Sequence, residues 1–230
     1  MEHRASLIVA SGPIFAGKTT LLHSLLDFLP PDVRQYPLRG FAEEFDFTDR
    51  YGPEDTYLVT EEISNHQYEY LWGYQVTKAF QLLPRGYRLG GTIHARNVRE
   101  VAYLLHGILD VPLPHLAELG LIVTLQAVNG RTYYDEPIRR VDSVSVIGME
   151  DKNLVAQTLA ARESMDSDFV YAPEKVVRDV LARKFDIQTD NVFSEVAARE
   201  ALLRRLLDSG DCSREDVKQA ISDYYLSQSS

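Results

Sequence analysis

Residues 7–20 read LIVASGPIFAGKTT, and this stretch decides the fold. The apolar run 7–10 predicts a buried strand, and residues 12–19 fill every fixed position of the pattern G-x-x-x-x-G-K-T. A helical pattern follows from Lys18 onward. Its apolar face consists of Leu21, Leu22, Leu25, Leu26 and Leu29. Strand, glycine loop and helix in this order are typical of a phosphate-binding loop, and we expect a P-loop NTPase.

The residue types in this loop match the chemistry of holding phosphate. Gly12 and Gly17 let the backbone bend so that its N–H groups point inward at phosphate oxygens. The helix that begins near Lys18 adds the positive end of its dipole. Lys18 can reach the β- and γ-phosphates, and the Thr19 hydroxyl can ligate magnesium. The predicted nucleotide-binding residues are Gly12, Pro13, Ile14, Phe15, Ala16, Gly17, Lys18, Thr19 and Thr20.

Length and composition limit the classes of protein to consider. The 230 residues suffice for one α/β domain with a small appendage. A net charge of −10 argues against a large nucleic-acid footprint. No run of eighteen apolar residues occurs, and the chain passes from Met1 almost directly into the first strand, so we expect neither a membrane span nor a signal peptide. The single cysteine, Cys212, cannot form an internal disulfide. These features predict a soluble, cytoplasmic protein.

Downstream apolar segments predict further strands and helices. Strands are expected over residues 34–39, 57–62, 87–96 and 121–128, and helices over residues 67–83 and 98–109. Residues 137–148 alternate as if to return antiparallel to the strand 121–128. Helices between strands imply a mostly parallel α/β sheet with an antiparallel hairpin at one edge.

The composition changes after Met149, where the remaining segments read as helical. The expected helices cover residues 154–161, 174–185, 193–209 and 214–225. We therefore predict two domains, an ATPase-like core over residues 1–149 and a helical subdomain over residues 150–230.

Two carboxylates end the predicted strand 57–62. A P-loop enzyme needs an acidic group at such a strand end for the magnesium and the attacking water. Glu61 and Glu62 are adjacent on a strand and point to opposite faces, so only one of them can face the nucleotide. His94 ends the next strand, where a lone histidine is usually structural.

Residues 91–101, GTIHARNVREV, resemble the histidine box of the type II/IV secretion ATPase superfamily, which powers pilus, archaellum and secretion machines. The resemblance continues through residues 112–121, the arginine pair 139–140 and the tail 195–225. It covers most of the chain and is closest to the C-terminal RecA-like ATPase domain of archaeal members, without their N-terminal domain.

The resemblance implies a function and roles for individual residues. It implies an ATPase that uses ATP and Mg²⁺ to drive assembly or transport. Lys18 and Glu61 become the candidate catalytic residues of the loop and the second motif, with Thr19 and Glu61 at the metal. His94 matches the histidine that senses the γ-phosphate. The implied partners are further copies of the chain in a ring, with a hexamer as one form, and a membrane-embedded secretion or pilus platform at the inner face of the membrane. No direct nucleic-acid partner is expected.

The sequence also departs from the family, and two other readings stay open. Ile63 stands where the family has an arginine, and either Glu43 or Glu44 is left to fill its acidic box. With the N-terminal domain absent, arginines near the histidine motif are candidates to act across a subunit boundary. They are Arg85, Arg88, Arg96 and Arg99. These departures also fit a nucleotide-binding adaptor with little turnover. The loop further resembles that of thymidine kinases, but one cysteine cannot build their zinc ribbon.

Overall fold

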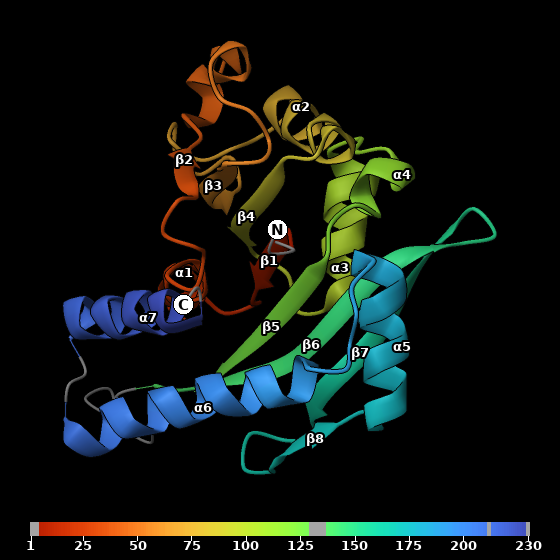
Figure 1. Cartoon of the computed structure of the whole chain (residues 1–230). Coiled ribbons are helices and arrows are strands. Elements are labelled where there is room, and N and C mark those ends of the chain that lie inside the picture. The colour runs from red at the N-terminus through yellow and green to blue at the C-terminus, as the bar shows by residue number, and fades with distance from the viewer. Residues whose placement is uncertain (1–4, 129–136, 211–212, 229–230) are drawn as a thin grey trace.

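An eight-stranded sheet in the order β2-β3-β4-β1-β5-β6-β7-β8 forms the centre of the molecule (Figure 1). This computed structural model describes residues 5–128, 137–210 and 213–228. The first five strands in this order are mutually parallel, and β6, β7 and β8 continue the sheet antiparallel. The predicted α/β class, with a mostly parallel core and an antiparallel extension, is confirmed.

The parallel strands are largely buried, as expected for strands covered by helices on both faces, except for the mostly exposed edge strand over residues 34–37. They are β1 (Leu7–Ala10), β2 (Arg34–Pro37), β3 (Thr56–Ile63), β4 (Arg88–Ile93) and β5 (Leu121–Val128). Their C-terminal ends meet at one edge of the sheet, where ligands bind in open α/β folds.

The antiparallel part is larger than the sequence predicts. It consists of β6 (Ile138–Glu150), β7 (Asn153–Arg162) and β8 (Phe169–Tyr171). The helix expected over residues 154–161 is therefore wrong. A two-residue turn at Asp151 and Lys152, both with positive φ, returns the chain along β6 instead. Such turns match the twist of paired strands and form a hairpin.

Helices cover the two faces of the parallel sheet separately. Helix α1 (Lys18–Leu26) packs Leu22 and Leu26 against Val9 and Tyr57 on one face. The helical layer on the other face consists of α2 (Tyr74–Gln81), α3 (Val98–Ala102) with its π-helical continuation Tyr103–Ile108, and α4 (Leu113–Leu116). Of the helix expected over residues 67–83, only α2 forms. Gly73 precedes it with a φ of 62°, and residues 64–72 form a loop.

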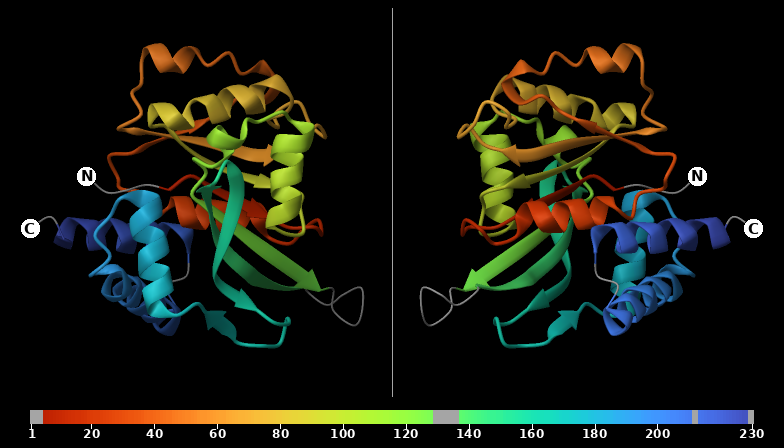
Figure 2. Two further views of the ribbon diagram at one scale, coloured as in Figure 1. Left: turned by 90° about the vertical axis from the view of Figure 1, so that its right-hand side faces the viewer. Right: turned by 90° about the vertical axis from the view of Figure 1, so that its left-hand side faces the viewer.

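Three helices complete the chain at one side of the molecule, away from α2 and α3 (Figure 2). They are α5 (Glu174–Phe185), α6 (Val192–Ser209) and α7 (Arg214–Gln228), close to the three predicted segments. Helix α5 packs Val180 against Val146 of β6 and Leu159 of β7. Within the described part of the chain, no helix is long and apolar enough to cross a membrane.

Candidate functional site

The loop between β1 and α1 has the backbone geometry that a phosphate site needs. Phe15 has a φ of 58° and Gly17 a φ of 87°, so the chain turns tightly before α1 begins at Lys18. The N–H groups of a first helical turn have no intrahelical partner and carry partial positive charge. A Cβ at Gly12 would lie 2.5 Å from Cγ of Arg96, so a larger residue does not fit there without moving that side chain. The domain has a P-loop α/β fold.

Lys18 is the cation at the centre of this site. Its side chain is only 7% exposed, and Nζ lies 3.3 Å from Nε2 of His94 and 3.9 Å from Oε2 of Glu62. Burial lowers the pKa of Lys18, and the nearby Glu62 carboxylate partly opposes this shift. The loop, the end of β3 and the residue after β4 therefore converge on one ammonium group.

His94 contacts both other members of this cluster. Its Nε2 lies 3.4 Å from Oε2 of Glu62, so Lys18, His94 and Glu62 form a triangle of contacts. The strand that carries His94 is tied to β3 because the Thr92 hydroxyl donates to the Glu61 carbonyl over 2.7 Å. The sequence-predicted residues Lys18 and His94 are thus brought together.

Glu61, by contrast, does not lie where the sequence places it. We expected Glu61 to face the nucleotide loop, but its Oε1 is 2.9 Å from Nε2 of His23 on α1, and its side chain is 51% exposed. Glu62 is 12% exposed and contacts Lys18. The cause is a bulge in β3, where Thr60 pairs with Gly91 and Ile63 pairs with Ile93, so that three steps along β3 match two along β4. A bulge redirects the side chains that follow it.

A cleft of about 880 Å³ joins the loop to these strand ends. The cleft is lined by Lys18, Glu62, His94 and the loop residues His66, Gln67 and Tyr70. Its lining also includes Thr20, Leu21 and Ser24 of α1 together with Leu125, Arg139, Arg140 and Val141. Its volume lies within the range of small-molecule sites. Gly12 and Pro13 are not among the lining residues, whereas Ile14 to Thr20 all are.

Sequence reasoning missed the contribution of residues 64–72. His66 comes to 3.9 Å from Oε1 of Glu62, and its ring centroid is 6.3 Å from that of His94. Desolvation raises the pKa of Tyr70, and the negative charge of Glu62 adds to this shift. Because we expected a helix over residues 67–83, the sequence did not place the side chains of this loop beside the cleft, although Gly73 marks where the loop ends.

The acidic candidates Glu43 and Glu44 lie outside the cleft. Glu43 is buried, and its carboxylate accepts hydrogen bonds from the backbone N–H of Arg39 and of Phe45, both over 2.8 Å. It therefore shapes the turn after β2. Glu44 is exposed and instead lines a separate pocket with Phe45 and Arg85.

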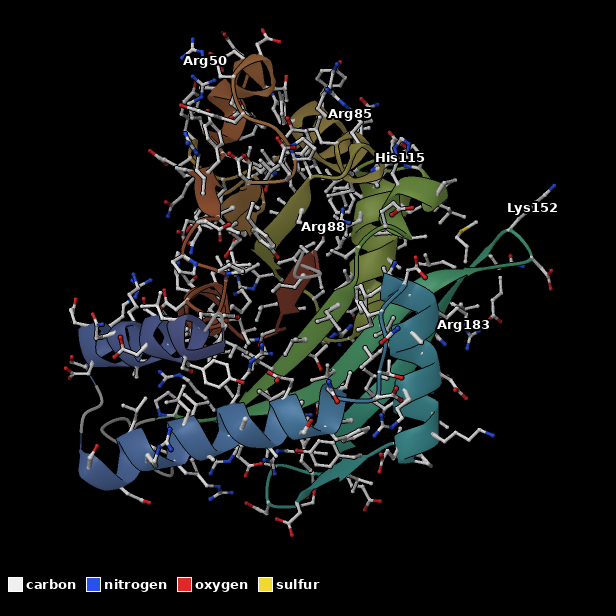
Figure 3. The ribbon with its side chains drawn as sticks, in the orientation of Figure 1. Arg50, Arg85, Arg88, His115, Lys152 and Arg183 are labelled. Atoms are coloured by element: carbon white, nitrogen blue, oxygen red, sulfur yellow. The ribbon has the colours of Figure 1, made fainter. Side chains whose placement is uncertain are left out.

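The four arginines expected around the histidine motif fall into two pairs, with Arg96 and Arg99 after the C-terminal end of β4, where Arg99 is exposed on α3. Arg88 begins β4 and Arg85 precedes it, whereas His94 follows the other end of that strand, so these two arginines lie at the opposite end of β4 from His94 (Figure 3). Arg96 lies beside the loop, but its guanidinium is paired with Glu100. Arg139, which the sequence singled out only as part of a resembling pair, contacts the loop directly.

The residues around the loop fit a nucleotide-borne magnesium ion. Mg²⁺ keeps several waters and usually takes one or two protein ligands besides substrate phosphates. Thr19 lines the cleft next to Lys18 and is exposed, so its hydroxyl is available as such a ligand. Among the residues whose positions are described, no group of three or more His, Cys, Asp or Glu side chains could hold a metal by itself. Glu61, the other predicted metal residue, does not line the cleft.

Comparison with known proteins finds similarity only among solved structures. No protein-family profile matches the sequence, and no curated protein sequence does. The VirB11 ATPase from the Brucella suis type IV secretion system, solved with sulphate, is similar over 62% of this chain and 48% of its own, with 14% identity and a TM-score of 0.38. The Legionella pneumophila ATPase DotB is similar over 97% of this chain and 61% of its own, with 15% identity and a TM-score of 0.40.

Both are ATPases. The first comes from a type IV secretion system. This chain spans 48% of the length of one and 61% of the length of the other.

Proposed function

We propose that this protein is a Mg-ATP-binding ATPase related to the motors of type II/IV secretion, type IV pilus and archaellum systems. The observation that carries the proposal is the convergence of Glu62 and His94, from two neighbouring strand ends, on the loop lysine Lys18. A phosphate-binding loop alone would indicate nucleotide binding. A carboxylate and a histidine beside the loop lysine in the same cleft add groups that can act on a terminal phosphate.

In this proposal the residues of the cleft divide the work of phosphoryl transfer to water. The backbone N–H groups of residues 15–20 hold the phosphates, and Lys18 neutralises charge on the β- and γ-phosphates. Bound magnesium, held by Thr19, would polarise the phosphoryl oxygens. Glu62 accepts a proton from the attacking water, and His94, within contact distance of Lys18, responds to the terminal phosphate. Glu61 is the competing candidate for the carboxylate role.

The contacts of Lys18 imply a step that precedes chemistry. Its ammonium group contacts both Glu62 and His94. Phosphate oxygens that bind Lys18 compete with both contacts, which frees the Glu62 carboxylate to meet water. Binding and activation of the base are thereby linked through one cation.

The test of nucleotide binding is Lys18→Ala, measured by titration calorimetry with Mg-ATP. We expect the variant to lose most of its affinity and all turnover, because the cation that meets the β- and γ-phosphates is removed. Lys175→Ala is the matched control, since Lys175 is exposed on α5 and outside the cleft. Equal ATP affinity in both variants would refute the proposal.

A second candidate is an ATP-binding adaptor with little turnover. The tight triangle of Lys18, Glu62 and His94 favours it, because a carboxylate engaged by the loop lysine is not free to activate water. If ATP bound but no phosphate were released over many binding lifetimes, the result would favour the adaptor over the ATPase. Transfer of the phosphoryl group to a nucleoside instead of water would indicate a kinase.

As a motor, the chain would work in a ring of identical subunits against a membrane platform. Light scattering with and without ATP measures whether the ring forms.

A further inference from the structure

We propose that Arg139 of β6 supplies a second cation to the phosphate site from within the same chain. This inference rests on the proposed function and extends it to a residue that has no role so far. Lys18 approaches the phosphates from α1, whereas Arg139 reaches them from the antiparallel extension of the sheet.

The Arg139 side chain lies on the phosphate-binding loop. Its Nε donates a hydrogen bond to the carbonyl of Phe15 over 2.8 Å. Its Cδ would lie 3.2 Å from a Cβ at Gly17, so the arginine chain lies directly over that glycine. Gly17 therefore serves two purposes, since it permits the left-handed backbone before α1 and leaves room for Arg139.

Arg139 also keeps a positive charge and free donors that it can offer to an anion. The guanidinium group carries five N–H donors in a rigid fork, and the bond to Phe15 uses only the Nε donor. The acceptor is a neutral carbonyl, which leaves the positive charge uncompensated by that contact. Within residues 5–128, 137–210 and 213–228, no carboxylate forms a salt bridge with Arg139. Arg139 also lines the cleft that holds Lys18 and Thr19.

Arg96 shows by contrast why Arg139 is the better candidate. Its side chain also packs on the loop, at Gly12. However, its Nε donates to Oε1 of Glu100 over 2.8 Å, and its backbone N–H donates to the other oxygen of the same carboxylate. A guanidinium paired in this way has little net charge to offer a phosphate. Of the two arginines on the loop, Arg139 is the one that can bind an anion bidentately.

Calorimetry of Arg139→Gln with Mg-ATP, Mg-ADP and AMP tests the assignment. We expect affinities for ATP and ADP to fall by about tenfold or more, the usual effect of losing a hydrogen bond to a charged group, while AMP affinity stays unchanged. Arg139→Lys should recover part of the loss, since it keeps the charge but not the fork. Arg204→Gln is the control, because Arg204 is exposed on α6 and pairs with Glu200.

The salt dependence of ATP affinity distinguishes a contact between Arg139 and phosphate from a purely structural contact between Arg139 and the loop. The ATP affinity of the wild type should fall more steeply with salt than that of Arg139→Gln, because one charge pair is missing in the variant. Equal slopes, equal loss of AMP and ATP affinity, or an Arg139→Gln variant that matches Arg204→Gln would each overturn the inference. If the wild type bound no ATP, the proposed function and this inference would both fail, whereas normal wild-type binding with any of those outcomes removes Arg139 alone.

Discussion

A single inserted residue in β3 decides which of two carboxylates reaches the loop lysine. Strand alternation correctly predicts that Glu61 and Glu62 point apart, and the structure separates them in this way. The bulge between Thr60 and Ile63 then leaves Glu62 beside Lys18 and Glu61 beside His23. Because a bulge is set by pairing with β4, a pattern within β3 alone does not reveal it.

We predict that Glu62→Gln lowers the rate of ATP turnover by about a hundredfold or more, the usual contribution of a positioned base. The same variant should keep or raise its affinity for ATP, because Lys18 loses a competing carboxylate. Glu61→Gln is the matched variant, with the same chemical change one residue away. Steady-state phosphate release and calorimetry measure the two effects. If Glu61→Gln were the more damaging change, the sequence-based assignment of Glu61 would be restored.

Part of the candidate site can be predicted from residue patterns in the sequence. The loop from Gly12 to Thr20 and the convergence of Lys18 and His94 follow from sequence, because a phosphate loop and the end of a parallel strand occupy fixed places in this fold. The positions of the His66 and Tyr70 side chains do not follow from sequence, because these residues lie in a loop and no periodic pattern predicts the path of a loop. Arg139 lies more than a hundred residues from Phe15, and only the pairing of β5 with β6 brings it there.

Helix α3 carries a cap whose strength depends on pH. The Asn97 side chain accepts a hydrogen bond from the backbone N–H of Glu100 over 3.0 Å, and the Glu100 carboxylate accepts one from the backbone N–H of Arg96 over 2.8 Å. This arrangement resembles a capping box, except that the glutamate accepts from the N–H of Arg96, the residue before the N-cap, rather than from that of Asn97. The Arg96 guanidinium, through its hydrogen bond and charge, lowers the pKa of Glu100. The cap follows His94 by three residues, so it fixes the start of the helix behind the site.

We expect Glu100→Gln to lower the melting temperature at neutral pH and to have a shrinking effect in acid. A carboxyl whose pKa is lowered by folding contributes stability above its unfolded pKa and loses it as pH falls through the lowered value. The difference in melting temperature between wild type and Glu100→Gln should therefore decrease as pH falls below the ordinary glutamate range. Scanning calorimetry at several pH values measures it, with Glu200→Gln on α6 as a control for a surface ion pair. A difference that stayed constant down to the acid range would contradict the role of the charge.

At the scale of elements, the sequence predicts strands and helices well where local pattern and tertiary context agree. Strand β5 has the expected bounds because it is a short, nearly continuous apolar run, and helix α5 because its apolar residues follow the helical period. Strand β7 is predicted wrongly because Val155, Ala156 and Leu159 have the spacing i, i+1, i+4, which also suits a helix, whereas pairing with β6 decides the outcome. The turn at Asp151 and Lys152 contains no glycine that would indicate a hairpin in the sequence.

The whole molecule links the nucleotide loop to the C-terminal helices through α1. This helix begins at Lys18 in the site, and its C-cap residue is Asp27. The Asp27 side chain is 6% exposed and receives Arg214 over 3.3 Å and Lys218 over 3.5 Å, both from α7. The Tyr225 hydroxyl adds a hydrogen bond to the carbonyl of Phe28 over 2.6 Å. Helix α1 therefore connects the nucleotide loop at its N-terminal end with α7 at its C-terminal end, although the loop and α7 are about two hundred residues apart in sequence.

We predict that Asp27→Asn loosens α7 while leaving the sheet intact. The substitution keeps the size of the side chain but removes the charge that holds Arg214 and Lys218, at a cost of about 1 kcal/mol, the upper end for partly exposed ion pairs. Amide hydrogen exchange in α7 should accelerate about fivefold, which corresponds to that free energy for a local opening. Asp32→Asn removes the same charge from an exposed position after α1 and serves as the control. Exchange in α7 at the same rate in both variants would show that Tyr225 and the apolar contacts hold this helix without the ion pairs.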